Sequence, residues 1–352
     1  MPFTTINKSS LHFNTKLYTG NGSAGRDITG IGFQPDWVWI KNRSRSSNHT
    51  LVDVLRGSGS YPLSSSSTVA QDTGDTNQVS ALISDGFTVG SSTNTNANSE
   101  NLVGWSWKAN GAGSANTDGS INTTYTSANT TSGFSIIQYT GNATAGATIG
   151  HGLGKVPEFI IFRRYAQAEN WGVYLKAAEG ATDFKRIFYL NTNGGGNVDT
   201  TVLNNTEPSS SLITLGTSVL SNASNPMIAY AFAPIQGFSK FGKYIGSGNA
   251  DGPVVYTGFK PALIIFKKNA TDNWWMFDNK RDPDNVTTHV LMPDENAAET
   301  SGSSEKYFDI LSNGFKIRNT TTNVNGAGTD YYYMAFAEAP LVGSNNVPAT
   351  AR

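Results

Sequence analysis

The chain has 352 residues, a formal net charge of −1 and no cysteine. Its length predicts two or three domains, and 38% hydrophobic residues are enough to build globular cores. Only 14% of the residues are charged, which argues against the clustered basic face that a nucleic-acid partner requires. The absence of cysteine excludes a disulfide framework and thiolate metal sites.

The polar surface must be built from Ser, Thr, Asn and 37 glycines, a composition typical of β proteins with many turns. The first residues, MPFTTINKSSLHF, lack the basic and apolar regions of a signal peptide, and no apolar run reaches the length of a membrane span. We therefore expect synthesis in a cytoplasm without a secretion signal, and no membrane insertion.

In chain order, the first clear element is a predicted strand at residues 33–41, FQPDWVWIK, which recurs at residues 156–163 and 259–267. Each copy has a proline, one further residue, a four-residue apolar run and a cation. A run rich in aromatic and β-branched residues that is bounded by proline predicts a strand buried on both faces. Three copies suggest three domains.

The segments around these strands repeat in the same order. An aromatic-X-Gly element precedes each copy, and a second strand follows it after a polar turn. Asp85-Gly86 and Asn313-Gly314 are tight-turn signals in the first and third copies. Each repeat ends in a strand that alternates bulky and small residues, at residues 103–108, 228–233 and 332–337. The intervals from the anchoring proline to an aligned bulky residue of this strand are 70, 73 and 73 residues, and composition bias alone does not produce such regular spacing.

These patterns predict an all-β fold with three tandem antiparallel β-sandwich domains that resemble jelly rolls and are related by internal repeat. The strand order stays open. Helical signals are scarce, the best being residues 294–300 and 177–184. The predicted boundaries are residues 1–110 for repeat 1 with a short N-terminal arm, 111–132 for a Gly/Ser/Asn/Thr-rich flexible linker, 133–236 for repeat 2, 237–343 for repeat 3 and 344–352 for a C-terminal tail.

No catalytic, metal or cofactor site is predicted. The four histidines, at positions 12, 49, 151 and 289, show no triad or metal-ligand spacing. The carboxylate pairs at 72/75, 282/284 and 294/295 lie in turn-like segments, and residues 281–285 lack the ligand spacing of a calcium loop. We expect Arg56 to pair with Asp53 rather than with a substrate.

Aromatic side chains could stack on sugar rings. Trp37, Trp39, Trp105 and Trp107 align with aliphatic and other aromatic residues in the other repeats, which indicates a core role. The candidates for contact with a ligand or partner are Trp171, Trp274, Trp275, Tyr331, Tyr332 and Tyr333.

Four segments carry a family resemblance: GFQPDWVWIKNRS, SDGFTVGS, NLVGWSWKANG and the C-terminal YYYMAFAEAPLVGSNNVPATAR. With them the chain resembles tandem-repeat virion structural proteins, such as tail-fibre and surface proteins, of tailed phages that infect marine bacteria. The resemblance implies a tail-fibre, tail-tip or other surface component of the particle, without assigned catalytic residues.

We therefore expect a non-enzymatic virion protein, assembled in the host bacterial cytoplasm, that contacts host-surface glycan through several β modules. Its expected partners are other virion proteins and further copies of itself, with a homotrimer favoured by the fibre resemblance. One alternative is a capsid decoration or head-fibre protein with a purely structural role. The other is an enzyme that degrades surface polysaccharide.

Overall fold

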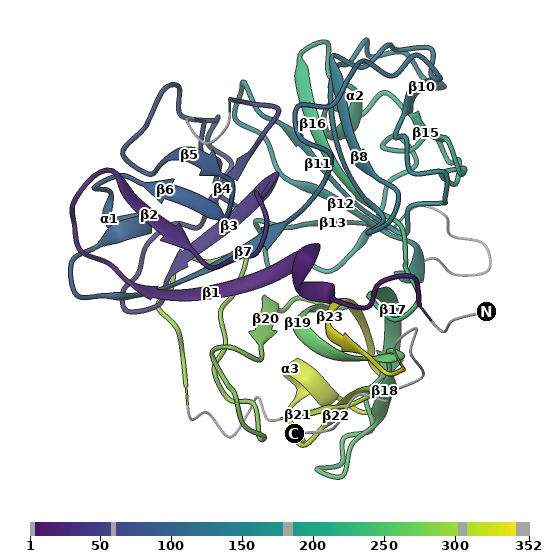
Figure 1. Ribbon diagram of the computed structural model, residues 1–352. Coiled ribbons are helices and arrows are strands. Elements are labelled where there is room, and N and C mark those ends of the chain that lie inside the picture. The colour runs from purple at the N-terminus through teal and green to yellow at the C-terminus, as the bar shows by residue number, and fades with distance from the viewer. Residues whose placement is uncertain (1–3, 58–60, 179–185, 302–307, 343–352) are drawn as a thin grey trace.

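The computed structural model describes residues 4–57, 61–178, 186–301 and 308–342. Over these residues the chain is all-β, with antiparallel strands in six sheets and a few helices of three or four residues (Figure 1). This confirms the all-β class and the antiparallel strand pairing of the prediction. Among the described residues, no helix has the length and apolar character needed to cross a bilayer.

We keep the terms repeat 1, repeat 2 and repeat 3 for the residue ranges given above. The elements of repeat 1 are a 3-10 helix η1 (Ser9–Leu11), β1 (Phe13–Thr19), β2 (Arg26–Thr29), β3 (Trp37–Asn42), β4 (Thr50–Asp53), β5 (Val79–Ile83), β6 (Gly86–Val89), α1 (Thr93–Asn96) and β7 (Asn101–Trp107). Strand β8 (Tyr125–Asn129) lies between repeats 1 and 2. The elements of repeat 2 are β9 (Phe134–Thr140), β10 (Ala147–Gly150), β11 (Phe159–Arg164), β12 (Gly172–Leu175), η2 (Lys176–Ala178), β13 (Arg186–Tyr189), β14 (Asn197–Val198), β15 (Leu212–Leu215), α2 (Val219–Asn222) and β16 (Pro226–Phe232). The elements of repeat 3 are β17 (Ser239–Ile245), β18 (Val254–Tyr256), β19 (Phe259–Lys268), β20 (Trp274–Asp278), β21 (Phe308–Leu311), β22 (Gly314–Ile317), α3 (Thr322–Asn325) and β23 (Asp330–Pro340).

The same strand order occurs three times. The larger sheets contain the orders β1-β7-β3-β4, β9-β16-β11-β12 and β17-β23-β19-β20, and the smaller sheets are β2-β6-β5, β10-β15 and β18-β22-β21. In repeat 2, β8 extends one edge of the larger sheet, and β13 and β14 extend the other. The three repeats form three lobes, with repeat 1 at the left, repeat 2 at the upper right and repeat 3 at the bottom of Figure 1.

The turns and helices differ in how well they were predicted. Asp85-Gly86 and Asn313-Gly314 do join antiparallel pairs, β5 to β6 and β21 to β22. A Cβ on Gly86 would lie 1.9 Å from a backbone oxygen of β2, so only glycine fits there. The predicted helix at residues 294–300 does not form. Of the predicted helix at 177–184, only the 3-10 helix that ends at Ala178 lies within the described residues.

The flexible linker predicted at residues 111–132, which we call the spacer, is instead part of the folded structure. β8 pairs with β9 in register from Tyr125↔Gln138 to Asn129↔Phe134. Ile121 forms a parallel bridge with Ile149 of β10 and is buried in the core of repeat 2. The prediction was wrong because these contacts depend on backbone and hydroxyl hydrogen bonds, which need no run of apolar residues.

A central aromatic cluster joins the three repeats. Trp37 of repeat 1 stacks on Tyr230 of repeat 2, with ring centroids 4.6 Å apart and an interplanar angle of 21°. Phe336 of repeat 3 lies 5.2 Å from Phe13 of repeat 1 and 5.6 Å from Phe232 of repeat 2. All five side chains are buried, and each aromatic pair of this kind contributes about 0.5–1.5 kcal/mol beyond its burial. The predicted core role of Trp37, Trp39, Trp105 and Trp107 agrees with their burial.

Each repeat also carries a buried cation that reaches into a neighbouring repeat. Lys41, Arg163 and Lys267, which end the three Pro-anchored runs, are fully buried. Each shares a backbone carbonyl with an N–H group a few residues further along its own repeat. In repeat 1, Lys41 Nζ (3.4 Å) and Ser47 N (2.8 Å) both donate to Asn296 O of repeat 3. In repeat 2, Arg163 Nη2 (2.8 Å) and Glu169 N (2.9 Å) both donate to Thr68 O of repeat 1. In repeat 3, Lys267 Nζ (3.0 Å) and Asp272 N (2.8 Å) both donate to Asn193 O of repeat 2.

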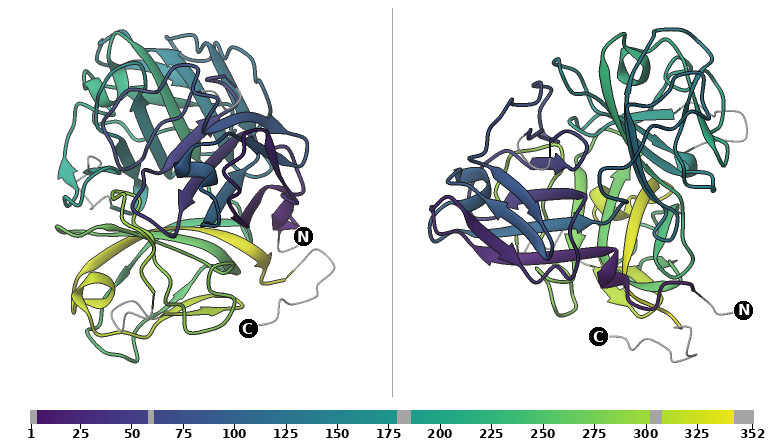
Figure 2. Two further views of the ribbon diagram at one scale, coloured as in Figure 1. Left: turned by 90° about the vertical axis from the view of Figure 1, so that its left-hand side faces the viewer. Right: turned by 45° about the horizontal axis from the view of Figure 1, so that its top comes forward.

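A second set of side chains donates hydrogen bonds between the same pairs of repeats and in the same direction. The aligned residues His49, Trp171 and Trp274 each donate a ring N–H to a carbonyl of a neighbouring repeat. His49 Nε2 binds Met292 O (3.0 Å), Trp171 Nε1 binds Ser64 O (2.9 Å) and Trp274 Nε1 binds Tyr189 O (2.9 Å). Both sets therefore run from repeat 1 to 3, from 3 to 2 and from 2 to 1, so the three repeats close on one another in a ring (Figure 2).

Candidate ligand pocket

The six aromatic residues predicted to contact a ligand all lie in the interior. Trp171, Trp274, Trp275, Tyr331, Tyr332 and Tyr333 are each at most 4% exposed. Trp171 and Trp274 hold neighbouring repeats together, Tyr331 donates its hydroxyl to Thr322 O, and Tyr332 packs against Phe188 of repeat 2. Stacking on a sugar requires an exposed ring face, and the structure leaves none of these rings exposed.

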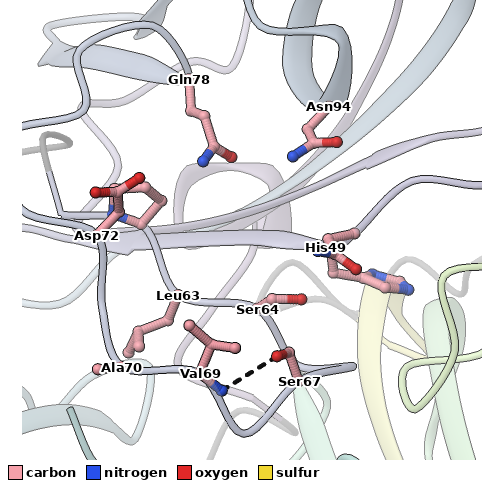
Figure 3. Close-up of a pocket in the computed structure, with 11 residues that line it drawn as sticks. His49, Leu63, Ser64, Ser67, Val69, Ala70, Asp72, Gln78 and Asn94 are labelled. Carbon is pink, nitrogen blue, oxygen red and sulfur yellow. Dashed lines mark hydrogen bonds between the residues drawn. The ribbon is translucent and has the colours of Figure 1, made fainter. Parts of the chain in front are cut away.

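The structure shows a polar pocket in repeat 1 instead, with a volume of about 190 Å³. In Figure 3 the carboxamides of Gln78 and Asn94 point into it from one side, and the segment from Ser64 to Ala70 forms the other side. Its polar lining is Asn48, His49, Ser64, Ser67, Asp72, Gln78 and Asn94, and its apolar lining is Pro62, Leu63, Val69 and Ala70.

The neighbouring repeats hold the floor of this pocket in place. Trp171 of repeat 2 donates its indole N–H to the carbonyls of Ser64 (2.9 Å) and Ser67 (3.2 Å). From the other direction, the Ser65 hydroxyl donates to Pro293 O of repeat 3 at 2.7 Å. The segment therefore has few free conformations, which lowers the entropy cost of binding a ligand.

The wall opposite is fixed by a shorter network. Thr50 of β4 donates its hydroxyl to Gln78 Oε1 at 2.6 Å, and Gln78 Nε2 donates to Asp75 Oδ2 at 3.1 Å. In the described part of the chain, the side-chain carboxamides of Asn48 and Asn94 make no hydrogen bond. Each carboxamide offers two donors and an acceptor, so both remain available to a ligand.

In repeats 2 and 3 the aligned carboxamide is already hydrogen-bonded. Asn48 aligns with Asn170 and Asn273. Asn170 Oδ1 accepts from Asn191 Nδ2 at 2.9 Å, and Asn273 Nδ2 donates to Glu295 Oε1 at 2.8 Å. In repeat 1, by contrast, Asn48 lines the pocket and its carboxamide has no hydrogen-bond partner among the described residues. Sequence alone offered no signal for this difference, because all three repeats carry Asn here.

The electrostatics of the pocket suit binding better than acid–base chemistry. Burial, with the nearby Lys41 charge, lowers the pKa of His49 to about 3. The ring is neutral, since Nε2 donates to Met292 O and Nδ1 accepts from Trp39 Nε1 at 2.8 Å. Both ring nitrogens are thus occupied. The pocket can offer amide and hydroxyl hydrogen bonds and the Asp72 carboxylate to a polar ligand.

Other polar candidates are already engaged with partners inside the protein. Arg56 Nε lies 2.6 Å from Asp53 Oδ2, which confirms the predicted pair. His289 Nδ1 lies 2.5 Å from Asp282 Oδ1, but Asp282 is engaged with the backbone N–H groups of Thr288 and His289. Within the described residues, no group of three or more His, Asp or Glu side chains could hold a metal ion.

Comparisons with known proteins give a family but no function. Neither the search of curated proteins nor that of solved structures finds a match. A family model described as Domain of unknown function (DUF7483) matches residues 8–340 and so spans all three repeats. The chain therefore belongs to the DUF7483 family.

Proposed function

We propose that this chain is a non-enzymatic structural protein on the surface of a tailed-phage particle, in a tail fibre or tail tip, and that it contacts host-surface glycan through the repeat 1 pocket. The observation that carries the glycan contact is that the carboxamides of Asn48 and Asn94 line the pocket and have no hydrogen-bond partner among the described residues. The aligned Asn170 and Asn273 are hydrogen-bonded within the protein. Saccharide hydroxyl groups both donate and accept hydrogen bonds, and carboxamides match them in both roles. The sequence resemblance supports the virion location.

We further propose that the three repeats are copies of one β-sandwich domain. The recurring strand order and the equivalent bonds between repeats support this. Because two sets of hydrogen bonds join the repeats, the chain presents the repeat 1 pocket on a rigid body. Avidity then comes from several copies of the chain in the particle, with a homotrimer as the expected assembly, and from their attachment to other virion proteins.

The test is binding of the purified protein to an array of bacterial surface glycans. Asn48→Ala and Asn94→Ala are expected to weaken binding about tenfold each, as the loss of one or two hydrogen bonds implies. Asn122→Ala is a matched control, because Asn122 is exposed and outside the pocket. Equal binding by all variants would remove the pocket from the proposal.

Two further readouts separate the alternatives. No glycan binding, together with localisation on the head by low-resolution imaging of the particle, would favour a decoration protein. Release of reducing sugar from host polysaccharide would favour an enzyme. The closed packing suits a rigid structural unit in either location.

A further inference from the structure

Strand β18 of repeat 3 is an unusual edge strand. It pairs with β22 on one side, and on its other side no strand lies within the described residues. Val254 and Tyr256 are 56% and 50% exposed, whereas Val255 between them is buried. An exposed apolar edge is a site where another extended chain can add by hydrogen bonding.

The equivalent edge in repeat 2 already carries such an addition. The spacer runs along β10, where Ile121 N donates to Thr148 O at 2.9 Å and Ser120 N donates to Thr148 Oγ1 at 2.8 Å. The register of the two sheets aligns Thr148 with Val254. This sheet edge therefore accepts an extended segment within the same molecule.

The equivalent edge in repeat 1 is protected in a different way. The register aligns Asp27 and Thr29 of β2 with Val254 and Tyr256 of β18. Asp27 Oδ1 accepts from Thr88 Oγ1 at 2.6 Å, and both Asp27 and Thr29 are exposed. Charged and polar residues on an edge discourage pairing with another strand. Of the three edges, one is covered, one is polar, and β18 is open and apolar.

A hollow of about 300 Å³ lies beside β18 and includes Tyr256, Gly237 and Lys240 in its lining. Lys240 Nζ donates to Tyr256 O at 2.7 Å and lies 5.5 Å from the centre of the Tyr256 ring. Burial lowers the pKa of Lys240, and the more distant charge of Glu158 opposes that shift. No carboxylate in the described part of the chain lies within salt-bridge distance of Lys240. An acidic side chain from outside would complement this charge.

We propose that the β18 edge binds an extended, acid-containing segment of a partner protein as an added strand, with an acidic side chain in the hollow next to Lys240. Backbone hydrogen bonds then supply affinity, and the hollow supplies specificity. The proposal does not depend on glycan binding, since this surface and the repeat 1 pocket are built from different residues.

The probe is a fluorescein-labelled peptide with the sequence of residues 114–124, SANTDGSINTT, which includes the segment that covers β10. Fluorescence anisotropy with the full chain measures its affinity. The double variant Val254→Asp/Tyr256→Thr gives β18 the residues of β2 and is expected to weaken binding at least about tenfold. Val219→Asp, at an exposed valine of α2, is the matched control and should bind as the wild type does.

The charge is tested separately. In the register of the spacer on β10, position 122 of the peptide falls next to Tyr256. A peptide with Asn122→Asp should therefore bind the wild-type chain several-fold more tightly than the unchanged peptide, and Lys240→Gln should remove that gain. The proposal would be overturned if Val254→Asp/Tyr256→Thr and the wild-type chain bound the peptide with equal affinity. It would also be overturned if the peptide did not bind the wild-type chain at millimolar concentration.

Other occupants of the edge give different results. Leu341 N donates to Gly258 O at 3.2 Å, so the chain leaves the described part close to the hollow. If deletion of residues 343–352 tightens peptide binding tenfold, that segment is the occupant and the partner proposal is wrong. If wild-type chains form a dimer in sedimentation that Val254→Asp/Tyr256→Thr abolishes, a second copy is the occupant, and the proposal is wrong as well.

Discussion

The hydroxyl of Tyr230 lies 2.7 Å from Asp53 Oδ2, although 177 positions separate the two residues. Trp105 aligns with Tyr230 and donates to Asp278 Oδ2 of repeat 3 at 3.1 Å. Asp53 and Asp278 each also bind an arginine three positions later. At the remaining interface the aligned residues are Met334 and Leu175, which belong to the same apolar cluster. Two of the three interfaces between repeats therefore have a hydrogen-bonded polar pair at this position, and the third has an apolar pair.

The first prediction concerns Tyr230→Phe, which removes one donor from a buried carboxylate. We expect the free energy of unfolding to fall by about 1.5–3 kcal/mol, the range for hydrogen bonds to charged groups. Urea unfolding measures it. Tyr332→Phe is the matched control, because the Tyr332 hydroxyl makes no hydrogen bond within the described residues and should cost little. Equal losses in the two variants would mean that the Tyr230–Asp53 bond adds nothing.

The second prediction concerns replacing the polar residues at the interface of repeats 1 and 2 with the apolar residues found at the interface of repeats 2 and 3. Asp53→Leu alone leaves Arg56 buried without its carboxylate and should cost about 3–5 kcal/mol. The triple variant Asp53→Leu/Arg56→Ala/Tyr230→Met reproduces the residues Leu175, Ala178 and Met334. It should recover at least about 2 kcal/mol of that loss, because an ion pair can be replaced by packed apolar groups at little cost. A triple variant no more stable than the single one in urea would contradict the equivalence of the interfaces.

How far sequence leads to this fold depends on the kind of contact. The Pro-anchored strands could be predicted, because their apolar runs and flanking prolines are local signals. The ring of repeats could not, since its bonds end on backbone carbonyls such as those of Asn193 and Met292, and a carbonyl has no sequence signature. The pocket depends on the same kind of contact, where Trp171 binds the carbonyls of Ser64 and Ser67.

The three short α-helices were missed for a related reason. Each ends in a buried asparagine, Asn96, Asn222 or Asn325, in a segment of Ser, Thr and Asn that resembles a turn. An aromatic residue of the first strand, Tyr18, Tyr139 or Tyr244, donates its hydroxyl to the carbonyl just before that asparagine. Only the tyrosine was visible in the sequence as part of the aromatic-X-Gly element.

The third prediction tests these asparagines. Asn222 Nδ2 donates to Gly216 O (2.7 Å) and Thr144 O (2.9 Å), and its Oδ1 accepts from Asn142 N (2.9 Å). Asn222→Ala leaves these groups without partners and should destabilise the protein by about 2–4 kcal/mol. The exposed Asn122→Ala should change stability by less than about 0.5 kcal/mol. A similar small effect for both in urea unfolding would show that the buried network is not stabilising.

The fourth prediction concerns His49. Its folded pKa, lowered to about 3 by burial, lies below the unfolded value of 6.5. The folded protein therefore binds fewer protons between these values, so this contribution to stability is present above pH 6.5 and is lost as the pH falls toward 3. Nitrogen-15 NMR, with the signals of His49 assigned by their loss in His49→Gln, should show the His49 ring neutral and protonated at Nε2 down to about pH 4. Titration of His49 near pH 6.5 would contradict its burial as a neutral donor and acceptor.

The last prediction concerns Asp294, whose contribution to stability changes with pH in the opposite direction to that of His49. Burial raises its pKa to about 7, and in the described residues its Oδ2 has no hydrogen-bond partner, while Oδ1 accepts from Trp274 N at 3.0 Å. Because the folded pKa lies above the unfolded value of 3.8, the folded protein binds more protons between pH 3.8 and 7. The contribution of Asp294 to stability is therefore present below pH 3.8 and is lost as the pH rises through 7.

Asp294→Asn keeps the Oδ1 acceptor and removes the charge. We expect this variant to match the wild type near pH 4 and to exceed its free energy of unfolding by about 1–3 kcal/mol at pH 8. The comparison is made at each pH, so the opposing contribution of His49 cancels. Asp72→Asn, at an exposed carboxyl, is the control and should follow the wild-type profile. If the free energy of unfolding of Asp294→Asn also follows the wild-type profile in urea from pH 4 to 8, then ionisation of the Asp294 carboxyl does not destabilise the folded protein.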